Sequence, residues 1–329
     1  MLRNTKSILL VSLVVHATLC TGAPQSPPAV TDPAKADADF AVQGEYSGEL
    51  PSDEGKVKWG VQVIALGDGK FQATAYRGGL PGDGWDKSER VKAMGKTEGD
   101  VTTIVADQGS GMIKNGVMTI TDSNGSAIGD LKKVERQSST LGAKPPAGAV
   151  VLFDGTTAEK FEGGRMTENK LLMQGVTSKQ KFQSYTLHLE FMTPYMPKAT
   201  GQARGNSGCY SQGRYEVQIL DSFGLDGKNN ECGGIYSIRD PDQNMCFPPL
   251  TWQTYDIDYI AATYDDSGKK TKNARMTVRH NGVVIHENVA LPKDTTGAPV
   301  KEGPDPGPIY LQDHGNPVRF RNIWVADRK

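Results

Sequence analysis

The sequence predicts an all-β protein built from two folded units. The 329 residues contain 38 glycines and 19 prolines, which supply frequent turns, and helical periodicity is hard to find after residue 45. Strand-forming runs occur instead, at Val57–Leu66, Phe71–Tyr76, Val117–Thr121, Thr186–Met192 and Met276–His280. Because the chain is longer than one hydrophobic core usually requires, we expect two domains.

The first residues have the order of a secretory signal. Arg3 and Lys6 precede a largely apolar run, Ile8–Leu19, and small residues follow it. The run is too short for a comfortable membrane span. We therefore expect residues 1–23 to be a signal peptide, cleaved near Cys20–Ala23, and the mature protein to be periplasmic or extracellular.

The rest of the chain divides by composition. Residues 24–39 are rich in Pro, Ala and Asp, which predicts a disordered leader. Residues 40–137 alternate short strand-like segments with glycine-containing turns, as in a small antiparallel β domain. A proline-containing linker is expected at 138–148, and the large domain at 149–329.

Three cysteines remain after removal of the signal, so at most one disulfide can form within the chain. Cys232 and Cys246 lie in polar or Gly/Pro-containing loops, and we predict that they pair, which would stabilise the fold by roughly 2–4 kcal/mol. Cys209 lies on a predicted strand without a flanking base, which indicates a small buried hydrophobe. The cysteine spacings do not match a zinc site.

The most informative segment is a predicted strand, turn and strand at residues 205–222. Its second arm places Glu216 and Gln218 on one face, about 6–7 Å apart, and Val217 and Ile219 on the other. A second polar segment lies near the C-terminus. The motifs read Asn206-Ser207-Gly208-Cys209-Tyr210, Tyr215-Glu216-Val217-Gln218-Ile219-Leu220-Asp221-Ser222 and Leu311-Gln312-Asp313-His314-Gly315-Asn316-Pro317-Val318-Arg319-Phe320-Arg321-Asn322-Ile323.

These motifs resemble the 3-keto-disaccharide hydrolase family, with a similarity that covers about residues 148–329. The resemblance implies a concanavalin A-like jelly-roll sandwich of two curved antiparallel sheets, preceded here by the small β domain. It also implies an exported enzyme that cleaves 3-keto-glycosides. Analogy at the level of the fold does not establish a reaction, so the residues need their own interpretation.

A 3-keto sugar allows simple chemistry. The C3 carbonyl acidifies the hydrogen on C2, so a base can remove it, the substituent can leave C1 with acid assistance, and water can add afterwards; net hydrolysis is the other route. We expect Glu216 and His314 to carry the proton transfers, in an order that the sequence leaves open. Candidates for substrate binding, by hydrogen bonding or stacking, are Asn206, Tyr210, Gln212, Gln218, Tyr236, Gln312, Arg319 and Arg321.

Other interpretations remain open. The spacing from Glu216 to Asp221 resembles laminarinase-type β-glucan hydrolases, in which a bulge lets both ends of the motif face the cleft; Asp221 would then be a second catalytic carboxylate. A non-catalytic, lectin-like glycan-binding module is a further alternative. In addition, His314 could simply stabilise a turn, and Glu216 could form an ion pair with Arg214 or Arg319.

Net charge and residue spacing also limit the classes of binding partner that we expect. The net charge of -1 argues against nucleic acid or a membrane surface as a partner. The resemblance implies a carbohydrate substrate, and we expect no cofactor. A divalent cation such as Ca²⁺ stays open because Asp240, Asp242 and Asn244 alternate in a loop, although no downstream bidentate Glu follows. His188 and Glu190 are expected on a solvated strand face. The sugar linkage, the aglycone and the oligomeric state are not determined.

Overall fold

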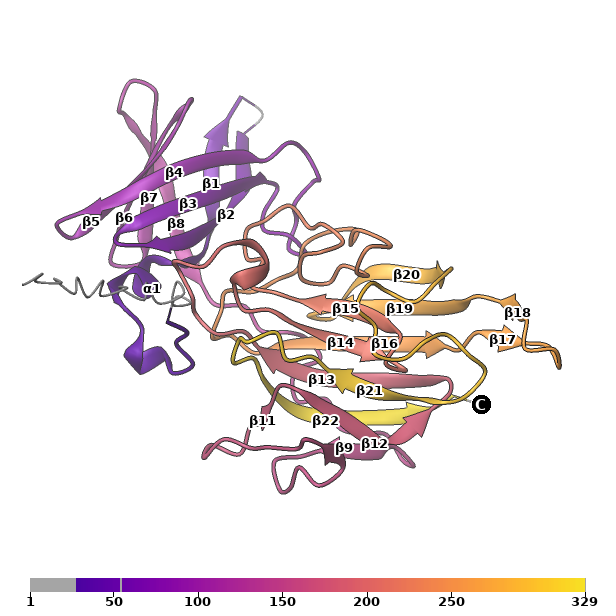
Figure 1. Cartoon of the computed structure of the whole chain (residues 1–329). Helices are drawn as coiled ribbons and strands as arrows, with labels where there is room; N and C mark the ends of the chain where they lie inside the picture. The colour runs from indigo at the N-terminus through magenta and orange to yellow at the C-terminus, as the bar shows by residue number, and fades with distance from the viewer. Residues whose placement is uncertain (1–27, 54, 329) are drawn as a thin grey trace, which may run out of the picture.

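The computed structural model describes residues 28–53 and 55–328, which form two β units in contact (Figure 1). The expected signal peptide, at 1–23, lies outside the described residues. Within the described part of the chain, no helix is both long and apolar enough to cross a membrane. The all-β prediction is confirmed.

The first unit is a closed barrel of eight antiparallel strands in chain order. Every strand pairs with the next along the chain, and the first pairs with the last to close the barrel. The strands are β1 (Gly44–Ser52), β2 (Gly55–Gly67), β3 (Lys70–Arg77), β4 (Val91–Glu98), β5 (Val101–Ala106), β6 (Gly109–Lys114), β7 (Val117–Asp122) and β8 (Ala127–Val134).

The segment before the barrel is ordered over its described part, which corrects the expectation of a disordered leader at 24–39. It contains a short 3-10 helix, η1 (Pro33–Lys35), and a helix, α1 (Ala38–Val42), which lies against one end of the barrel (Figure 1). Two acidic side chains of this segment find specific partners. Tyr195 Oη donates to Asp37 at 2.8 Å, and the Gly69 amide donates to Asp39 at 2.9 Å. Composition alone does not reveal such anchors.

The second unit is a sandwich of two antiparallel sheets. One sheet has five strands: β10 (Phe161–Glu162), β12 (Val176–Phe182), β21 (Gly307–Leu311), β14 (Ser207–Ser211) and β15 (Tyr215–Ile219). The other has seven: β9 (Val150–Phe153), β11 (Leu172–Met173), β13 (Tyr185–Met192), β16 (Gln253–Ile260), β19 (Ala274–His280), β20 (Val283–Leu291) and β22 (Arg319–Asp327). A separate pair, β17 (Thr263–Tyr264) and β18 (Lys270–Lys272), completes the unit, and the main core lies between the two sheets.

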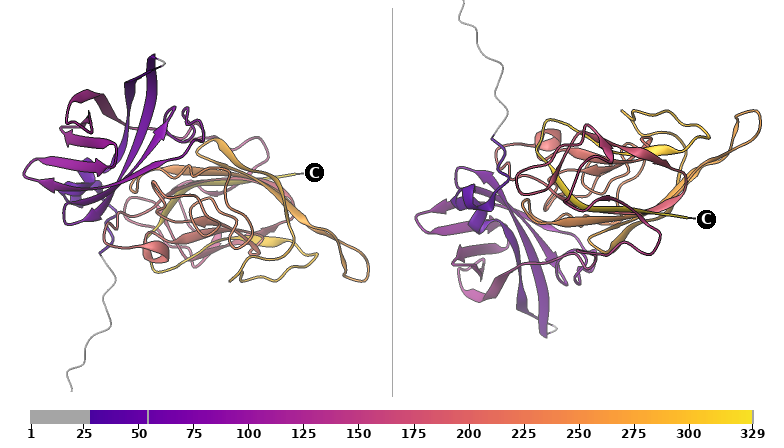
Figure 2. Two further views of the ribbon diagram at one scale, coloured as in Figure 1. Left: turned by 90° about the horizontal axis from the view of Figure 1, so that it is seen from above. Right: turned by 90° about the horizontal axis from the view of Figure 1, so that it is seen from below.

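The barrel lies at one end of the sandwich in both further views (Figure 2). Arg204 is central to the junction because its guanidinium binds Asp221 of the sandwich at 2.7 Å and also donates to the Ala65 carbonyl of the barrel at 3.2 Å. Thr74 donates to the Gly224 carbonyl at 2.9 Å. These contacts are buried, so the two units share a packed interface rather than a flexible tether.

Candidate functional site

The outer face of the β14–β15 hairpin carries the polar residues of the sequence motif. The two strands pair in regular register, with Tyr210 opposite Glu216 and Gly208 opposite Gln218. Val217 belongs to the core between the sheets. Since side chains alternate along a strand, Glu216 and Gln218 therefore project from the face of the five-stranded sheet that points away from the core. The predicted alternation of this arm agrees with the structure.

A row of three tyrosines and one carboxyl group crosses this face. Tyr310 lies opposite Tyr210, with ring centroids 5.3 Å apart, and Tyr210 lies opposite Glu216. Beyond β15, the Tyr236 amide donates to the Glu216 carbonyl at 3.2 Å, which brings Tyr236 to the other side of Glu216. Directly opposed residues of antiparallel strands share a face. The aromatic row of Tyr310, Tyr210 and Tyr236 thus flanks one carboxyl group.

Glycines make room for that carboxyl group. A Cβ atom on Gly208 would lie 2.2 Å from Glu216 Oε1, so any side chain there would displace the carboxyl. The Gln312 amide donates to the Gly208 carbonyl at 2.9 Å, which fixes the start of the C-terminal motif beside the hairpin. On the other side, the backbones of Gln218 and Gly234 are joined by a hydrogen bond of 2.9 Å. The second row across the sheet is therefore Gln312, Gly208, Gln218 and Gly234.

Burial sets the protonation of Glu216. The side chain is only 3% exposed, and this burial raises the pKa of Glu216 to about 7, although a hydrogen bond from Tyr210 acts in the opposite direction. Tyr210 Oη donates to Glu216 Oε2 at 2.8 Å, and Gln312 Nε2 donates to Tyr210 Oη at 3.2 Å. A carboxyl group with this pKa exchanges protons readily at neutral pH.

Gln218 completes the shell around Glu216. With its amide nitrogen turned toward Glu216, it donates to Oε1 at 2.8 Å and to the Ser207 carbonyl at 2.7 Å. Gln202, which the sequence analysis missed, lies 2.9 Å from the Gln218 amide and accepts a hydrogen bond from Asn206 Nδ2 at 3.1 Å. Gln202 lies in the 3-10 helix η2 (Gly201–Ala203). In the sequence, only its position four residues before Asn206 points to it.

Six of the predicted residues therefore gather around one another: Glu216, Tyr210, Gln218, Tyr236, Gln312 and Asn206. The Asn206 amide donates to the Asn316 side chain at 2.7 Å, which links the two motifs a second time. Asn206 Oδ1 is buried and has no hydrogen-bond partner.

Gln212 is not part of this group. It occupies the tight turn between β14 and β15, with a positive φ of 52°. Its side chain donates to the Phe182 carbonyl at 2.9 Å and accepts from Tyr259 Oη at 2.8 Å. Gln212 therefore ties the hairpin turn to neighbouring strands, and its role is structural.

Asp221 does not face Glu216 as the laminarinase-like interpretation requires. The β14–β15 register is regular but ends at Ile219, two residues before Asp221. Instead, Asp221 forms the buried ion pair with Arg204 at the junction of the two units. We therefore correct its assignment from a catalytic to an anchoring carboxylate.

Arg319 and Arg321 belong to β22 of the seven-stranded sheet. Arg319 donates to Gln174 Oε1 at 2.9 Å. Arg321 donates to Glu190 Oε2 at 2.6 Å, and its guanidinium lies 4.0 Å from the ring centroid of Trp252. Neither arginine contacts Glu216, so neither the predicted substrate role nor the alternative ion pair with Glu216 is supported by this geometry.

His188 and Glu190 are buried, which corrects the expectation of a solvated strand face. The linker covers them: the Gly142 amide donates to Glu190 at 2.7 Å. Burial alone would raise the pKa of Glu190, but hydrogen bonds from His188, Asn322 and Arg321 lower it to about 2. This carboxylate anchors the linker to the sheet.

His314 lies in the loop after β21, with an exposed side chain. Within the described chain it shares no hydrogen bond or ion pair with Glu216. Its connection to the site is through Gln312, two residues earlier, which contacts Tyr210.

Cys232 and Cys246 are neighbours but not bonded. All three cysteines of the described chain are free and buried, so the expected disulfide is not formed in this structure. The two thiols nevertheless lie close together, because each shifts the pKa of the other. The structure brings the predicted partners together, and their pairing stays a prediction.

The described residues contain no cluster of three or more His, Cys, Asp or Glu side chains able to hold a metal ion. The alternating acidic loop is used otherwise. Asp240 accepts from Asn229, and Asp242 pairs with Arg239 at 2.6 Å. Asn244 donates to the Ser222 carbonyl at 2.7 Å, so the three side chains serve separate contacts.

Comparison with known proteins places the chain in a family. Residues 148–326 match the profile of the 3-keto-alpha-glucoside-1,2-lyase-like domain. A candidate glycosyl hydrolase from Parabacteroides distasonis, solved at 2.13 Å, is 32% identical with a TM-score of 0.51, over 55% of this chain and 84% of that one. A second one from the same organism, solved at 1.70 Å, is 16% identical with a TM-score of 0.41, over 55% and 94%. No curated protein sequence matches the chain.

Proposed function

Since the chain belongs to the 3-keto-alpha-glucoside-1,2-lyase-like domain family, we propose that it cleaves the glycosidic bond of 3-keto-glycosides by elimination and hydration. Family membership makes the chain a carbohydrate-active protein of a glycoside-cleaving kind. The 3-keto specificity and the route of cleavage are the proposal. The observation that carries it is a single buried carboxyl group, Glu216, with a pKa near 7 in a row of tyrosines.

The chemistry needs only one carboxylate for its first step. The Glu216 carboxylate removes the proton from C2, the C3 carbonyl accepts the electron pair, and an enolate forms. The enolate then expels the C1 substituent, which leaves with its oxygen, and a C1–C2 double bond remains. Water afterwards adds its oxygen to C1 and a proton to C2, and the sum of both steps is hydrolysis.

The surroundings of Glu216 suit this sequence of steps. Tyr210 and Gln218 donate to the carboxyl group and thereby orient it, while the partly exposed Gln312 offers its amide group to the sugar hydroxyls. Tyr310 and Tyr236 offer ring faces on either side. A retaining glycosidase requires a second carboxyl group about 5–5.5 Å away, and Asp221 is engaged by Arg204 instead.

The first test compares a 3-keto-glucoside with its unoxidised parent. The wild-type protein should release the aglycone from the keto substrate alone, and Glu216→Gln should lower this rate at least about 100-fold. Glu302→Gln is the matched control, because Glu302 also accepts a hydrogen bond from a tyrosine, Tyr215, but lies outside the row. Cleavage of the parent would contradict the 3-keto specificity, and glycan binding without any turnover would favour a lectin.

The second proton transfer, to the leaving oxygen, is assigned to His314, because its loop begins at the residue that contacts Tyr210. A poor leaving group needs this proton and a good one does not. His314→Ala should therefore slow release of an alcohol such as methanol but leave release of 4-nitrophenol nearly unchanged. Equal rates of the variant and the wild type on both substrates would remove His314 from the mechanism.

A further inference from the structure

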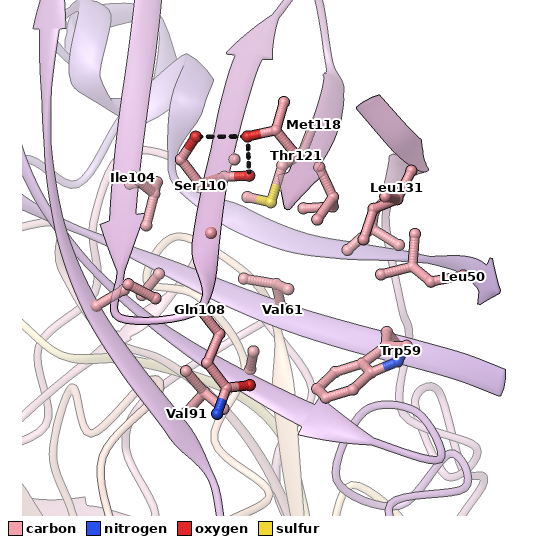
Figure 3. A pocket seen from close by; sticks show the side chains of 18 of the residues that line it. Leu50, Trp59, Val61, Val91, Ile104, Gln108, Ser110, Met118, Thr121 and Leu131 are labelled. Carbon is pink, nitrogen blue, oxygen red and sulfur yellow. Dashed lines mark hydrogen bonds between the residues drawn. The ribbon is translucent and has the colours of Figure 1, made fainter. Parts of the chain in front are cut away.

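The barrel encloses a cavity of about 240 Å³ that the proposed glycoside chemistry does not use (Figure 3). All eight strands contribute to its wall, which includes Trp59, Val61, Ile104, Met118 and Leu131. An eight-stranded barrel is just wide enough either to be filled by side chains or to hold one small ligand. The side chains at this end of the barrel decide between these two outcomes.

Small residues leave this end of the barrel hollow. The wall includes Ala73, Ala75, Ala93, Ala106, Gly109 and Gly111. Ala73 pairs with Ala93 across β3 and β4, and Ala106 pairs with Gly109 across β5 and β6, so short side chains oppose each other instead of interdigitating. A cavity results where larger residues would have filled the barrel.

The two ends of the barrel differ. At one end, Phe40 and Val42, from α1 and its last turn, pack against the barrel core. The cavity instead opens toward the turns that follow β1, β3, β5 and β7, where the rim residues Val91 and Ile128 are 38% and 36% exposed. Exposed apolar side chains around the mouth of an apolar cavity are typical of a ligand entrance.

The chemistry of the wall defines the ligand. Among the described wall residues none is charged, and the two hydroxyl groups, Ser110 and Thr121, hydrogen-bond to each other at 2.8 Å (Figure 3). One amide, that of Gln108, is at the mouth (Figure 3). We propose that the barrel binds one small uncharged apolar molecule, a ring system or a short alkyl chain, whose polar end, if present, faces Gln108.

The size of the cavity agrees with this class. An apolar cavity of about 150 Å³ stays dry and takes up benzene, so a cavity of about 240 Å³ accommodates one or two fused rings. Water gains little there, because the hydroxyl groups of the wall already satisfy each other. The proposal is independent of Glu216, which lies in the other unit of the chain.

The test uses the full mature chain and the uncharged fluorescent probe N-phenyl-1-naphthylamine. Ala93→Phe and Ala106→Phe fill the cavity from two different strands, and each should weaken the binding of the probe about tenfold or more. Met94→Phe is the matched control, because Met94 follows Ala93 on the same strand but is 57% exposed on the outer face. Thermal unfolding of each variant establishes that it is folded.

A second measurement does not depend on the filling variants. Bound probe should quench tryptophan emission, and Trp59→Phe should remove most of that quenching, since Trp59 lines the cavity. Naphthalene should compete with the probe at one site per chain. Absence of saturable binding, unchanged affinity in folded filling variants, or unchanged quenching in Trp59→Phe would each overturn the proposal.

Discussion

Glu216 owes its proposed catalytic role to its position in the fold. Its backbone belongs to a regular strand, and its side chain is nearly closed off from water by the opposed Tyr210 and by Gln218. No cationic side chain pairs with it within the described chain, so only hydrogen bonds, such as that from Tyr210, offset part of the cost of ionisation in this environment. The raised pKa of Glu216 is the consequence, and it predicts two effects of pH.

The first effect concerns the rate. Glu216 removes a proton only in its ionised form, so kcat/KM for the 3-keto-glucoside should rise with pH, with a midpoint near the pKa of about 7. A profile of kcat/KM across neutral pH measures this midpoint. A midpoint near the ordinary glutamate pKa, two or more units lower, would show that Glu216 is not the group that limits the reaction.

The second effect concerns stability. The pKa of Glu216 is raised in the folded state from 4.5 to about 7, so the folded state binds more protons and its free energy of unfolding falls as pH increases over this interval. Glu216→Gln removes this dependence. The variant should gain stability relative to the wild type between acidic and neutral pH, on the order of 2–3 kcal/mol. Urea unfolding at both pH values measures the difference, and a constant difference would contradict the shift.

Gly208 provides a steric test of the same carboxyl group. Gly208→Ala places a methyl group only 2.2 Å from Glu216 Oε1, so the carboxyl must move and turnover should fall roughly 100-fold. Gly303→Ala is the control, because the nearest atom to its added Cβ would be 3.8 Å away. Comparison of kcat for the two variants shows whether turnover depends on the position of the Glu216 carboxyl group. Equal activities would mean that this position is not critical.

For single residues, the sequence predicts which face of a strand a side chain occupies but not which distant residues it contacts. The alternation of Glu216 with Val217 is a property of one strand, so it can be predicted locally. The partners of Gln212 and Arg321 come from distant strands, Phe182 and Glu190 respectively, and no local pattern indicates them. The family motif therefore could not separate the polar residues that lie around Glu216 from those that hold the sheets together.

At the level of the elements, the carboxylate that follows β15, Asp221, holds the two units together. Asp221 follows the strand directly and meets Arg204, whose other contact is the barrel carbonyl of Ala65. Asp221→Asn leaves a buried guanidinium without its counter-charge and should destabilise the protein by about 3–5 kcal/mol. The activity per folded molecule should be nearly unchanged. Loss of turnover with unaltered thermal stability would instead restore Asp221 as a catalytic group.

The loops beside β15 carry the two adjacent thiols. Oxidation should join Cys232 to Cys246, since the thiols already lie close together, and should leave Cys209 free. Such a bond should stabilise the protein by roughly 2–4 kcal/mol through the loop that it closes. Mass spectrometry of a non-reduced digest identifies the bond. A linkage that involves Cys209, or stability that does not respond to reductant, would contradict this prediction.

Considered as a whole, the molecule combines a barrel and a sandwich that meet through buried contacts. The sequence predicted two β units and their approximate limits from turn composition. It could not predict that residues 28–39 are ordered, because their anchoring contacts, Asp39 with Gly69 of the barrel and Asp37 with Tyr195 of the other unit, join segments far apart in the chain. Barrel closure, between β1 and β8, is equally non-local and leaves no periodic signal.

The central claim is that Glu216 breaks a C2–H bond during cleavage, and deuterium incorporation tests it most directly. In heavy water, the elimination route should place one solvent deuterium on C2 of the released 3-keto sugar at each turnover, as measured by NMR. The sugar incubated with Glu216→Gln gives the background exchange next to the ketone. Release of a product that retains its original hydrogen on C2 would contradict the account and indicate direct hydrolysis.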